Sequence, residues 1–250
     1  SKLHNIFMLS KNQVKLIQKL HHKKYRNELN LFIVEGKKSI NEFLQAGYTP
    51  QLLIATEAFT TNVPQHLITP VSKDELRKVS ALQNPDEGLA VFEQPKHKGI
   101  LQEGVIVALD NVQDPGNLGT IIRLCDWFGV ETLLCNTQTV DCYNPKVVQA
   151  TMGSLTRVAV HYLDLAAFLT TTNMTVYTTD INKGSGLYST PFPDDVIIIL
   201  GNEANGVTPE VAALANQSLY IPRFSKHQRT ESLNVAMAGA IILSEVIGHH

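Results

Sequence analysis

The chain has 250 residues, 44% of them hydrophobic, which is enough to bury one large core or two modest ones. Its formal net charge of -2 means that a nucleic-acid partner would have to be held by a local basic patch. The scattered histidines, the absence of a C-x-x-C pair and the lack of any apolar stretch of about 18 residues disfavour a metal site, a disulfide framework and a membrane span. We therefore expect a soluble, cytoplasmic, metal-free protein of two domains.

The first predicted element is a helix over residues 12–26 with a one-sided basic face. Its lysines repeat every fourth residue, at Lys11, Lys15, Lys19 and Lys23. Residues 1–50 hold nine Lys and Arg against three Asp and Glu. Like charges at this spacing repel, and an RNA backbone would relieve the repulsion; a merely solvated face is the alternative. The residues predicted to contact RNA are Lys15, Lys19, Lys23 and Arg26.

Short apolar runs alternate with helical patterns through the rest of the front region. Strands are expected at 31–34, 51–55 and 88–93, and helices near 39–46 and 73–79. This alternation predicts a small α/β domain. The polar segment 95–99 contains proline and glycine and is the best candidate linker. We place a front domain that carries the basic, RNA-contacting face at 1–95 and a second domain at 100–248.

The second domain reads as an α/β fold with a mostly parallel sheet. Its apolar runs lie at 105–109, 132–135, 158–162, 175–178, 196–200 and 218–221. Helix-like segments separate most of them, as expected when helices cover both faces of a parallel sheet. Ligands of such sheets usually bind in loops at the carboxyl ends of the strands.

The first unusual loop follows the strand at 105–109 and spans residues 110–123. Pro115 and Gly116 force a turn, and Asn117 is a good N-cap for a helix that carries Arg123. The glycine spacing does not match the G-x-G-x-x-G of a dinucleotide fold. The loop therefore presents polar groups at a strand end, although a well-capped connection would also explain it.

The second unusual loop, 201–207, follows the strand at 196–200. Gly201 and Gly206 permit close approach of the backbone to a ligand, and Glu203 between them is costly to place there without a purpose. Thr208 and Pro209 then open a helix.

The third unusual segment begins at Ile221 and continues as a basic loop that contains Arg223, Lys226, His227 and Arg229. The sequence Glu231-Ser232-Leu233-Asn234-Val235 leads from this loop into an apolar C-terminal helix. The predicted apolar stripe of that helix is Leu233, Ala236, Ala240, Leu243 and Ile247. Core burial and a subunit interface explain such a stripe equally well.

Together these three segments resemble the SpoU (TrmH) family of SPOUT methyltransferases, which methylate ribose 2'-hydroxyls of tRNA or ribosomal RNA. The motifs are N-x-x-D-P-x-N-x-G-x-x-x-R at 111–123, L-G-x-E-x-x-G at 200–206 and S-L-N-V at 232–235. The match covers residues 105–247. The front region, with Phe-Ile-Val-Glu-Gly at 32–36, resembles the ribosomal-protein-like substrate-binding domain often fused to this family.

The resemblance implies a C-terminal trefoil knot that forms the pocket for S-adenosylmethionine, and a homodimer with the active site at the subunit interface. Residues matching the cofactor pocket are Gly201, Ile221 and Leu233. Residues matching the positions tied to catalysis and RNA placement are Asn117, Arg123, Glu203, Ser232 and Asn234.

Methyl transfer to oxygen needs in-line alignment of the hydroxyl with the methyl group. Arg123 is no base, because a guanidinium offers N–H donors and no acceptor. We expect it to bind a phosphate and stabilise the developing alkoxide, while Asn117 and Ser232 orient the ribose and Asn234 fixes the cofactor. Glu203 either bridges Arg123 or holds the loop.

The sequence departs from the family pattern in one place. The loop between Pro222 and Glu231 is longer than usual and has Ser225 where a glycine is common, so the rim of the cofactor pocket is expected to differ. Arg223 and Arg229 suit contacts with RNA phosphates.

Two other classes of protein compete with the methyltransferase. A non-catalytic RNA-binding protein of the same fold is opposed by the intact polar residues in all three segments. A nucleotide-dependent oxidoreductase lacks its glycine fingerprint. By analogy with the substrate-binding domain that it resembles, the front domain implies ribosomal RNA rather than tRNA as the substrate.

Overall fold

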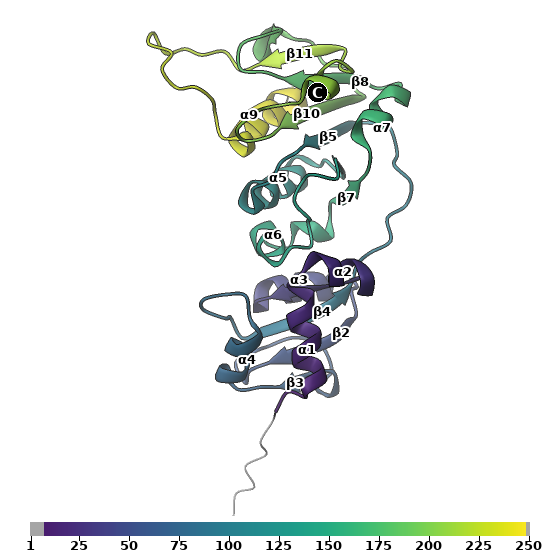
Figure 1. The fold of residues 1–250 in the computed structure, drawn as a ribbon, viewed down its shortest axis with the longest axis vertical. Helices are drawn as coiled ribbons and strands as arrows, with labels where there is room; N and C mark the ends of the chain where they lie inside the picture. Colours follow the sequence, from purple (N-terminus) through teal and green to yellow (C-terminus); the bar gives the residue numbers. More distant parts are fainter. Residues whose placement is uncertain (1–7, 249–250) are drawn as a thin grey trace, which may run out of the picture. The chain divides into compact units, whose positions relative to one another are not determined.

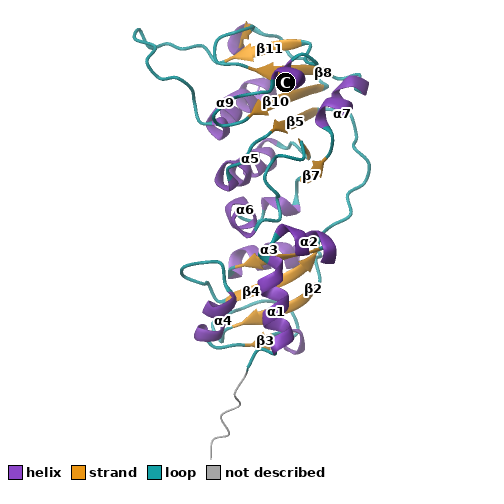
Figure 2. Cartoon of the chain, in the orientation of Figure 1, coloured by secondary structure: helices purple, strands orange, loops and turns teal. Residues whose placement is uncertain are grey.

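A computed structural model describes residues 8–248 of the chain (Figures 1 and 2). The described residues divide into two compact units: the N-terminal unit comprises residues 8–96 with Tyr143–Thr156, and the C-terminal unit comprises His97–Cys142 with residues 157–248. The break after Lys96 falls inside the predicted linker. Segment 143–156, predicted as part of the second domain, packs instead in the N-terminal unit, where the Tyr143 ring lies 4.7 Å from that of Phe32.

The N-terminal basic segment forms two helices rather than the single predicted one. Helix α1 spans Lys11–Leu20, and Ser10 caps it through a reciprocal pair of hydrogen bonds with Gln13. Helix α2 spans Lys23–Leu29 and follows an extended residue, His22. The His21 ring shares a 2.9 Å hydrogen bond with the Val79 carbonyl, which ties the break between the helices to the neighbouring helix α4, Lys73–Val79.

Arg26 does not present its guanidinium to RNA, and this prediction is corrected. The residue is 2% exposed, and its Nη1 donates a 3.1 Å hydrogen bond to the Leu20 carbonyl at the end of α1. A helix has unpaired carbonyls at its C-terminus, and the arginine satisfies one of them. The chain turns at His21, between α1 and α2. The Arg26 side chain therefore points toward the C-terminal end of α1 and does not extend the basic face.

The N-terminal sheet has the order β1-β4-β2-β3. Its strands are β1 Leu31–Glu35, β2 Pro50–Ala55, β3 Thr69–Pro70 and β4 Gly88–Glu93. Strand β4 runs antiparallel to β1 and β2, and β3 is parallel to β2. Helix α3, Lys37–Gln45, follows β1, and the 3-10 helix Gln65–Leu67 precedes β3. This unit confirms the predicted alternation of strands and helices, except for the short β3.

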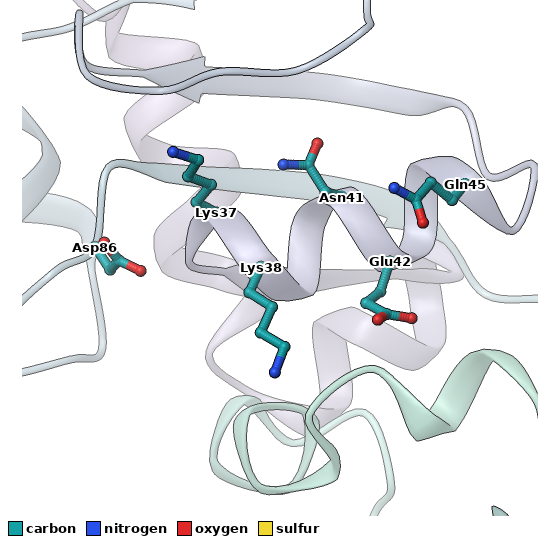
Figure 3. Close-up of a pocket in the computed structure, with 6 residues that line it drawn as sticks. All are labelled: Lys37, Lys38, Asn41, Glu42, Gln45 and Asp86. Carbon is teal, nitrogen blue, oxygen red and sulfur yellow. The ribbon is translucent and has the colours of Figure 1, made fainter.

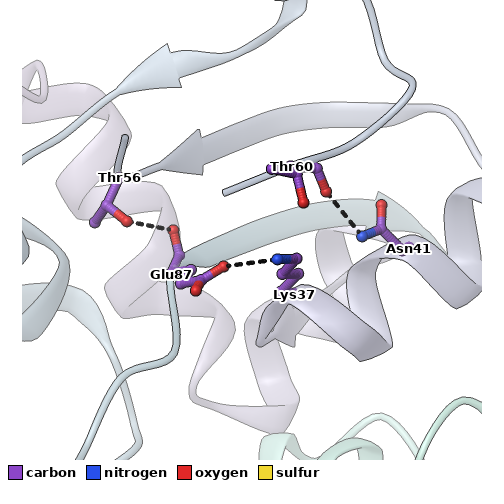
Figure 4. Close-up of polar contacts among 5 residues, drawn as sticks. All are labelled: Lys37, Asn41, Thr56, Thr60 and Glu87. Atoms are coloured by element: carbon purple, nitrogen blue, oxygen red, sulfur yellow. Dashed lines mark hydrogen bonds and ion pairs between the residues drawn. The ribbon is translucent and has the colours of Figure 1, made fainter. Parts of the chain in front are cut away.

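Polar contacts fix the start of α3 (Figure 4). Lys37 Nζ lies 3.6 Å from a Glu87 carboxylate oxygen, and Asn41 Nδ2 donates a 3.1 Å hydrogen bond to the Thr60 carbonyl. Thr56 Oγ1 donates to the Glu87 carbonyl at 3.3 Å. The start of α3 is therefore tied to two loops of its own unit.

The C-terminal unit contains a seven-stranded sheet in the order β7-β6-β5-β10-β8-β11-β9, and every neighbouring pair is parallel. The strands are β5 Val105–Asp110, β6 Thr132–Cys135, β7 Ala159–Tyr162, β8 Thr175–Thr179, β9 Ser185–Gly186, β10 Val196–Gly201 and β11 Gln217–Tyr220. The predicted mostly parallel α/β fold is confirmed. The sequence pattern missed only the two-residue β9 among these strands.

Helices cover both faces of this sheet. The helices after the front region are α5 Pro115–Phe128, α6 Pro145–Thr151, α7 Leu165–Thr171, α8 Pro209–Ala212 and α9 Val235–Gly248, with α6 belonging to the N-terminal unit. Helices α7 and α8 pack on the face that carries Ile106 and Ile197. Side chains alternate along a strand, so Leu200 lies on the other face, where it meets Gly239 of α9. Helix α9 also packs along α5.

The C-terminal helix is buried along a different stripe from the predicted one. Its buried residues are Ala236, Gly239, Ile242, Leu243 and Val246, whereas Leu233 precedes the helix and is exposed. Within residues 8–248, none of the helices is long and apolar enough to cross a membrane. Cys125, Cys135 and Cys142 are free and buried, and burial raises the pKa of the Cys125 thiol to about 12.

Candidate active site

Two central strands of the C-terminal unit end side by side. Gly201 at the end of β10 is paired with Asp110 at the end of β5, and β6 ends at Cys135 on the other side of β5. Because the strands are parallel, the loops that follow them emerge at one edge of the sheet. This edge brings together the first two unusual segments of the sequence.

Asp110 connects these loops, and the sequence analysis did not single it out. The residue is 1% exposed, and its Oδ2 accepts hydrogen bonds from both the backbone nitrogen and the Oγ1 of Thr208, each at 2.7 Å. Its Oδ1 accepts a 2.9 Å hydrogen bond from Asn136 Nδ2. A buried carboxylate is costly unless it is hydrogen-bonded, and here the loops after β6 and β10 supply the donors. The sequence signal that could have identified Asp110 is a charged residue at the end of an otherwise apolar strand.

Gly201 allows the loop after β10 to fold back onto the strand. A Cβ at this position would lie 2.2 Å from both the Gly206 carbonyl carbon and the Val207 nitrogen, so a side chain cannot fit. Asn202 and Gly206 exchange two backbone hydrogen bonds, at 3.0 and 2.9 Å. Asn202 Nδ2 also donates a 2.8 Å hydrogen bond to the Asn111 carbonyl. The loop is therefore a compact turn of main chain pinned to its neighbour.

Glu203 holds the loop after β5, which decides between the two roles left open for it. Its Oε1 accepts a 2.9 Å hydrogen bond from the Asp114 nitrogen, and its Oε2 accepts one of 3.2 Å from the Gln113 nitrogen. Among the described residues it forms no ion pair with Arg123. Asp114, rather than Asn117, is the N-cap of α5, because its side chain accepts from the Asn117 nitrogen at 2.8 Å.

A chain of side-chain hydrogen bonds then links all three unusual segments. Asn117 Nδ2 donates to Glu203 Oε1 at 3.4 Å, and Asn234 Nδ2 donates to Asn117 Oδ1 at 3.0 Å. The other amide atom of Asn234, Oδ1, caps α9 by accepting from the nitrogens of Ala236 and Met237. Asn117, Glu203 and Asn234, which come from three separate sequence motifs, are thus brought together within a single chain.

The remaining predicted residues are not part of this chain of hydrogen bonds. Arg123 is exposed on α5, and in residues 8–248 its guanidinium makes no hydrogen bond or ion pair. Ser232 is exposed, and Leu233 is 48% exposed. Ile221 is half-buried directly after β11. The predicted site residues outside the hydrogen-bonded set therefore include both polar and apolar side chains that are accessible on the surface.

The predicted RNA-binding residues other than Arg26 are exposed. Lys15, Lys19 and Lys23 lie on the surface of α1 and α2, and Lys19 Nζ lies 5.5 Å from the centroid of the Tyr25 ring. The first turns of α1 and α2 contain no acidic residue. The basic face therefore exists, shortened by the loss of Arg26.

A polar pocket of about 340 Å³ on α3 belongs to the N-terminal unit (Figure 3). It is lined by Lys37, Lys38, Asn41, Glu42, Gln45 and Asp86. The acids offset the lysines, so the pocket has no charge preference. A larger groove of about 1120 Å³ lies between α1, α4 and the end of β2. Neither cavity is lined by Asp110, Asn117, Glu203 or Asn234, the hydrogen-bonded residues at the ends of the strands.

The chain belongs to the SpoU rRNA methylase family, whose model matches residues 104–244. The model of the MRM3-like substrate-binding domain matches residues 11–90. These matches confirm the resemblance seen in the three motifs and in the front region.

Relatives of the whole chain carry related names. The Bacillus subtilis 23S rRNA (guanosine(2553)-2'-O)-methyltransferase is 32% identical and aligns with 96% of this chain and 98% of its own. A structure of a TrmH-family RNA methyltransferase from Porphyromonas gingivalis has a TM-score of 0.88 and 36% identity, covering 97% of this chain and 100% of its own. An AdoMet-bound rRNA methyltransferase from Sinorhizobium meliloti has a TM-score of 0.84 and 28% identity, with 96% of each chain covered.

Proposed function

We propose that the protein transfers a methyl group from S-adenosylmethionine to a ribose 2'-hydroxyl of ribosomal RNA. The observation that carries this proposal is the pair of side-chain hydrogen bonds that link Glu203, Asn117 and Asn234. They bring three distant motifs together at the edge of the sheet where the parallel strands end. The Bacillus subtilis relative, which aligns along nearly its whole length, is named for this reaction on 23S rRNA. That name also favours ribosomal RNA over tRNA, and with it a cytoplasmic location.

The edge of the sheet at the carboxyl ends of its strands suits a cofactor held mainly by main-chain groups. At Gly201 the backbone of the following loop comes so close that a Cβ would collide with it, which leaves peptide groups rather than side chains to form the pocket wall. We assign Gly201, Ile221 and Leu233 to this wall. Bound there, S-adenosylmethionine would supply an electrophilic methyl group on its sulfonium. The neighbouring residues must then align the ribose and exclude competing geometries.

Arg123 is the group assigned to the RNA side of the reaction. Its guanidinium is a cationic hydrogen-bond donor, so it binds a phosphate next to the target ribose and stabilises the negative charge that develops on the 2'-oxygen. Both amide atoms of Asn117 are engaged by Glu203 and Asn234, so Asn117 positions the loops rather than reaching freely for the ribose. Exposed Ser232 remains available to orient the ribose.

We also propose that the protein works as a homodimer through the C-terminal unit. Trp127 on α5 is 84% exposed and Met237 on α9 is 65% exposed, although both helices pack together. Large exposed apolar side chains on one helix pair are typical of a subunit interface. A partner copy there would also approach Arg123, which lies one turn before Trp127 on α5.

The basic face of α1 and α2 is proposed to hold the RNA backbone. We expect the double variant Lys15→Gln with Lys23→Gln to lower the salt dependence of RNA binding, reducing the slope of log K against log salt by about 1.4 to 1.8. Binding is measured by filter retention over a range of salt concentrations. The control Lys73→Gln with Lys78→Gln removes two exposed lysines of the same unit from α4, beside Asp74 and Glu75. Equal slopes for the two double variants would exclude a specific role for the basic face.

The catalytic proposal is tested by incubating the purified chain with S-adenosylmethionine labelled in the methyl group and 23S rRNA from cells that lack the gene. Label should enter the RNA and survive alkaline hydrolysis in one dinucleotide, because a 2'-O-methyl group blocks cleavage of the adjacent phosphodiester. Calorimetry should show one cofactor site per chain. Cofactor binding without label transfer to any RNA would support the non-catalytic alternative.

A further inference from the structure

The loop between β11 and α9 contains an internal clasp made by Arg223. Its Nη2 donates a 2.8 Å hydrogen bond to the Glu231 carbonyl, and its Nη1 donates one of 3.3 Å to the Gln228 carbonyl. Figure 1 shows this yellow-green loop extending away from the sheet. Residues 223–234 are all exposed, so the loop has no buried core of its own.

The clasp joins the two ends of the loop at the positions that matter for the proposed pocket. Arg223 lies two residues after Ile221, and Glu231 lies two residues before Leu233. Asn234, just beyond, is fixed by its hydrogen bond to Asn117. The two hydrogen bonds of the guanidinium thus close a ring around residues 224–230 and restrain the separation of the segments on either side of that loop.

This arrangement explains how the chain accommodates a basic loop that is longer than usual for its family. A flexible loop loses conformational freedom whenever its ends are brought together, and that cost falls on cofactor binding if the ends are free beforehand. An arginine suits this role because its planar fork donates in parallel to two carbonyl groups, whereas a lysine is a point charge on a flexible stem.

We propose that Arg223 is a positioning residue for the cofactor pocket, holding Ile221 and Leu233 at their working separation by clasping its own loop. The inference rests on the proposed function, because it requires that these two segments bind S-adenosylmethionine. It revises the earlier expectation for Arg223, whose guanidinium is engaged by its own loop rather than held free for an RNA phosphate.

The test compares Arg223→Lys with Arg229→Lys in the full-length protein. Both variants keep the charge of the loop, and in the described part of the chain Arg229 makes no hydrogen bond or ion pair, so only the first loses a clasp. We expect Arg223→Lys to weaken S-adenosylmethionine binding by roughly tenfold in calorimetry without RNA. Arg229→Lys, whose proposed contacts are with RNA alone, should bind the cofactor like the wild type.

A steady-state assay separates positioning from general damage. With Arg223→Lys, KM for S-adenosylmethionine should rise by a similar factor while kcat at saturating cofactor stays within about twofold and Tm is unchanged, because the loop is exposed. Equal cofactor affinities for the two variants would overturn the clasp. If the wild-type protein binds no S-adenosylmethionine at all, the proposed function fails instead.

Discussion

Replacing Arg123 with alanine is expected to lower kcat for RNA methylation by about 10²- to 10³-fold, the usual cost of removing one group that stabilises charge in a transition state. The guanidinium is exposed on α5 and makes no hydrogen bond or ion pair within the described residues of its own chain, so its removal should leave the folded unit intact. The affinity for S-adenosylmethionine measured without RNA should stay within about twofold, because Arg123 is assigned to the ribose and phosphate. Single-turnover methylation at saturating RNA and cofactor measures the chemical step directly.

Two further variants sharpen this expectation. Arg123→Lys keeps a positive charge but lacks the planar fork, so it should recover only part of the lost rate. Arg77→Ala removes an arginine that is exposed on α4 and paired with Asp74 at 3.5 Å, and it should methylate at the wild-type rate. Sedimentation should give all three variants the mass of the wild-type protein. Normal turnover by Arg123→Lys would remove Arg123 from the reaction.

The strands and most helices of the C-terminal unit could be predicted because their patterns are local. A strand covered on both faces by helices must be apolar at every position, and β10 follows this rule with all six residues from Val196 to Gly201 buried. The order of the strands is not local, since β5 lies between β6 and β10. Nothing in the composition of β5 specifies these neighbours, and the knot implied by the family resemblance stays a prediction for the same reason.

The errors in the N-terminal unit arose where a tertiary contact decides the local structure. Lysines every fourth residue predicted one helix through Arg26, but the His21 ring bonds to Val79 and Arg26 turns back to Leu20. Periodicity records which face is polar, and it does not record which charged side chain reaches a distant carbonyl. Helix caps carry the same ambiguity, since Asp114 and Asn117 are both good capping residues three positions apart.

The candidate site was predicted through its motifs, and its internal hydrogen bonds were not. Glu203 was left between two roles because its partners are backbone nitrogens of Gln113 and Asp114, which have no side-chain signature. Asp110 was overlooked because a single acid at the end of a strand is common, and only the structure shows that Thr208 and Asn136 donate to it. The sequence therefore located the candidate site, while the hydrogen bonds that indicate positioning roles within it are visible only in the folded chain.

Gly201→Ala should abolish measurable S-adenosylmethionine binding, and Gly99→Ala serves as its matched control. A Cβ on Gly201 would stand 2.2 Å from two backbone atoms, whereas one on Gly99 would meet nothing within 4 Å. Backbone cannot yield as the end of a flexible side chain does, so the 201–207 turn must open and release Asn202 from Asn111.

Such overpacking typically costs about 1–3 kcal/mol, which should lower Tm by several degrees without unfolding the protein. The loss of cofactor affinity should be far larger than this cost, at least a hundredfold, because the displaced turn is itself the proposed pocket wall. Calorimetry at a temperature well below Tm measures that affinity in the folded protein. Near-normal binding by Gly201→Ala would mean that the main chain beside Gly201 does not touch the cofactor, and the pocket would have to be sought away from the end of β10.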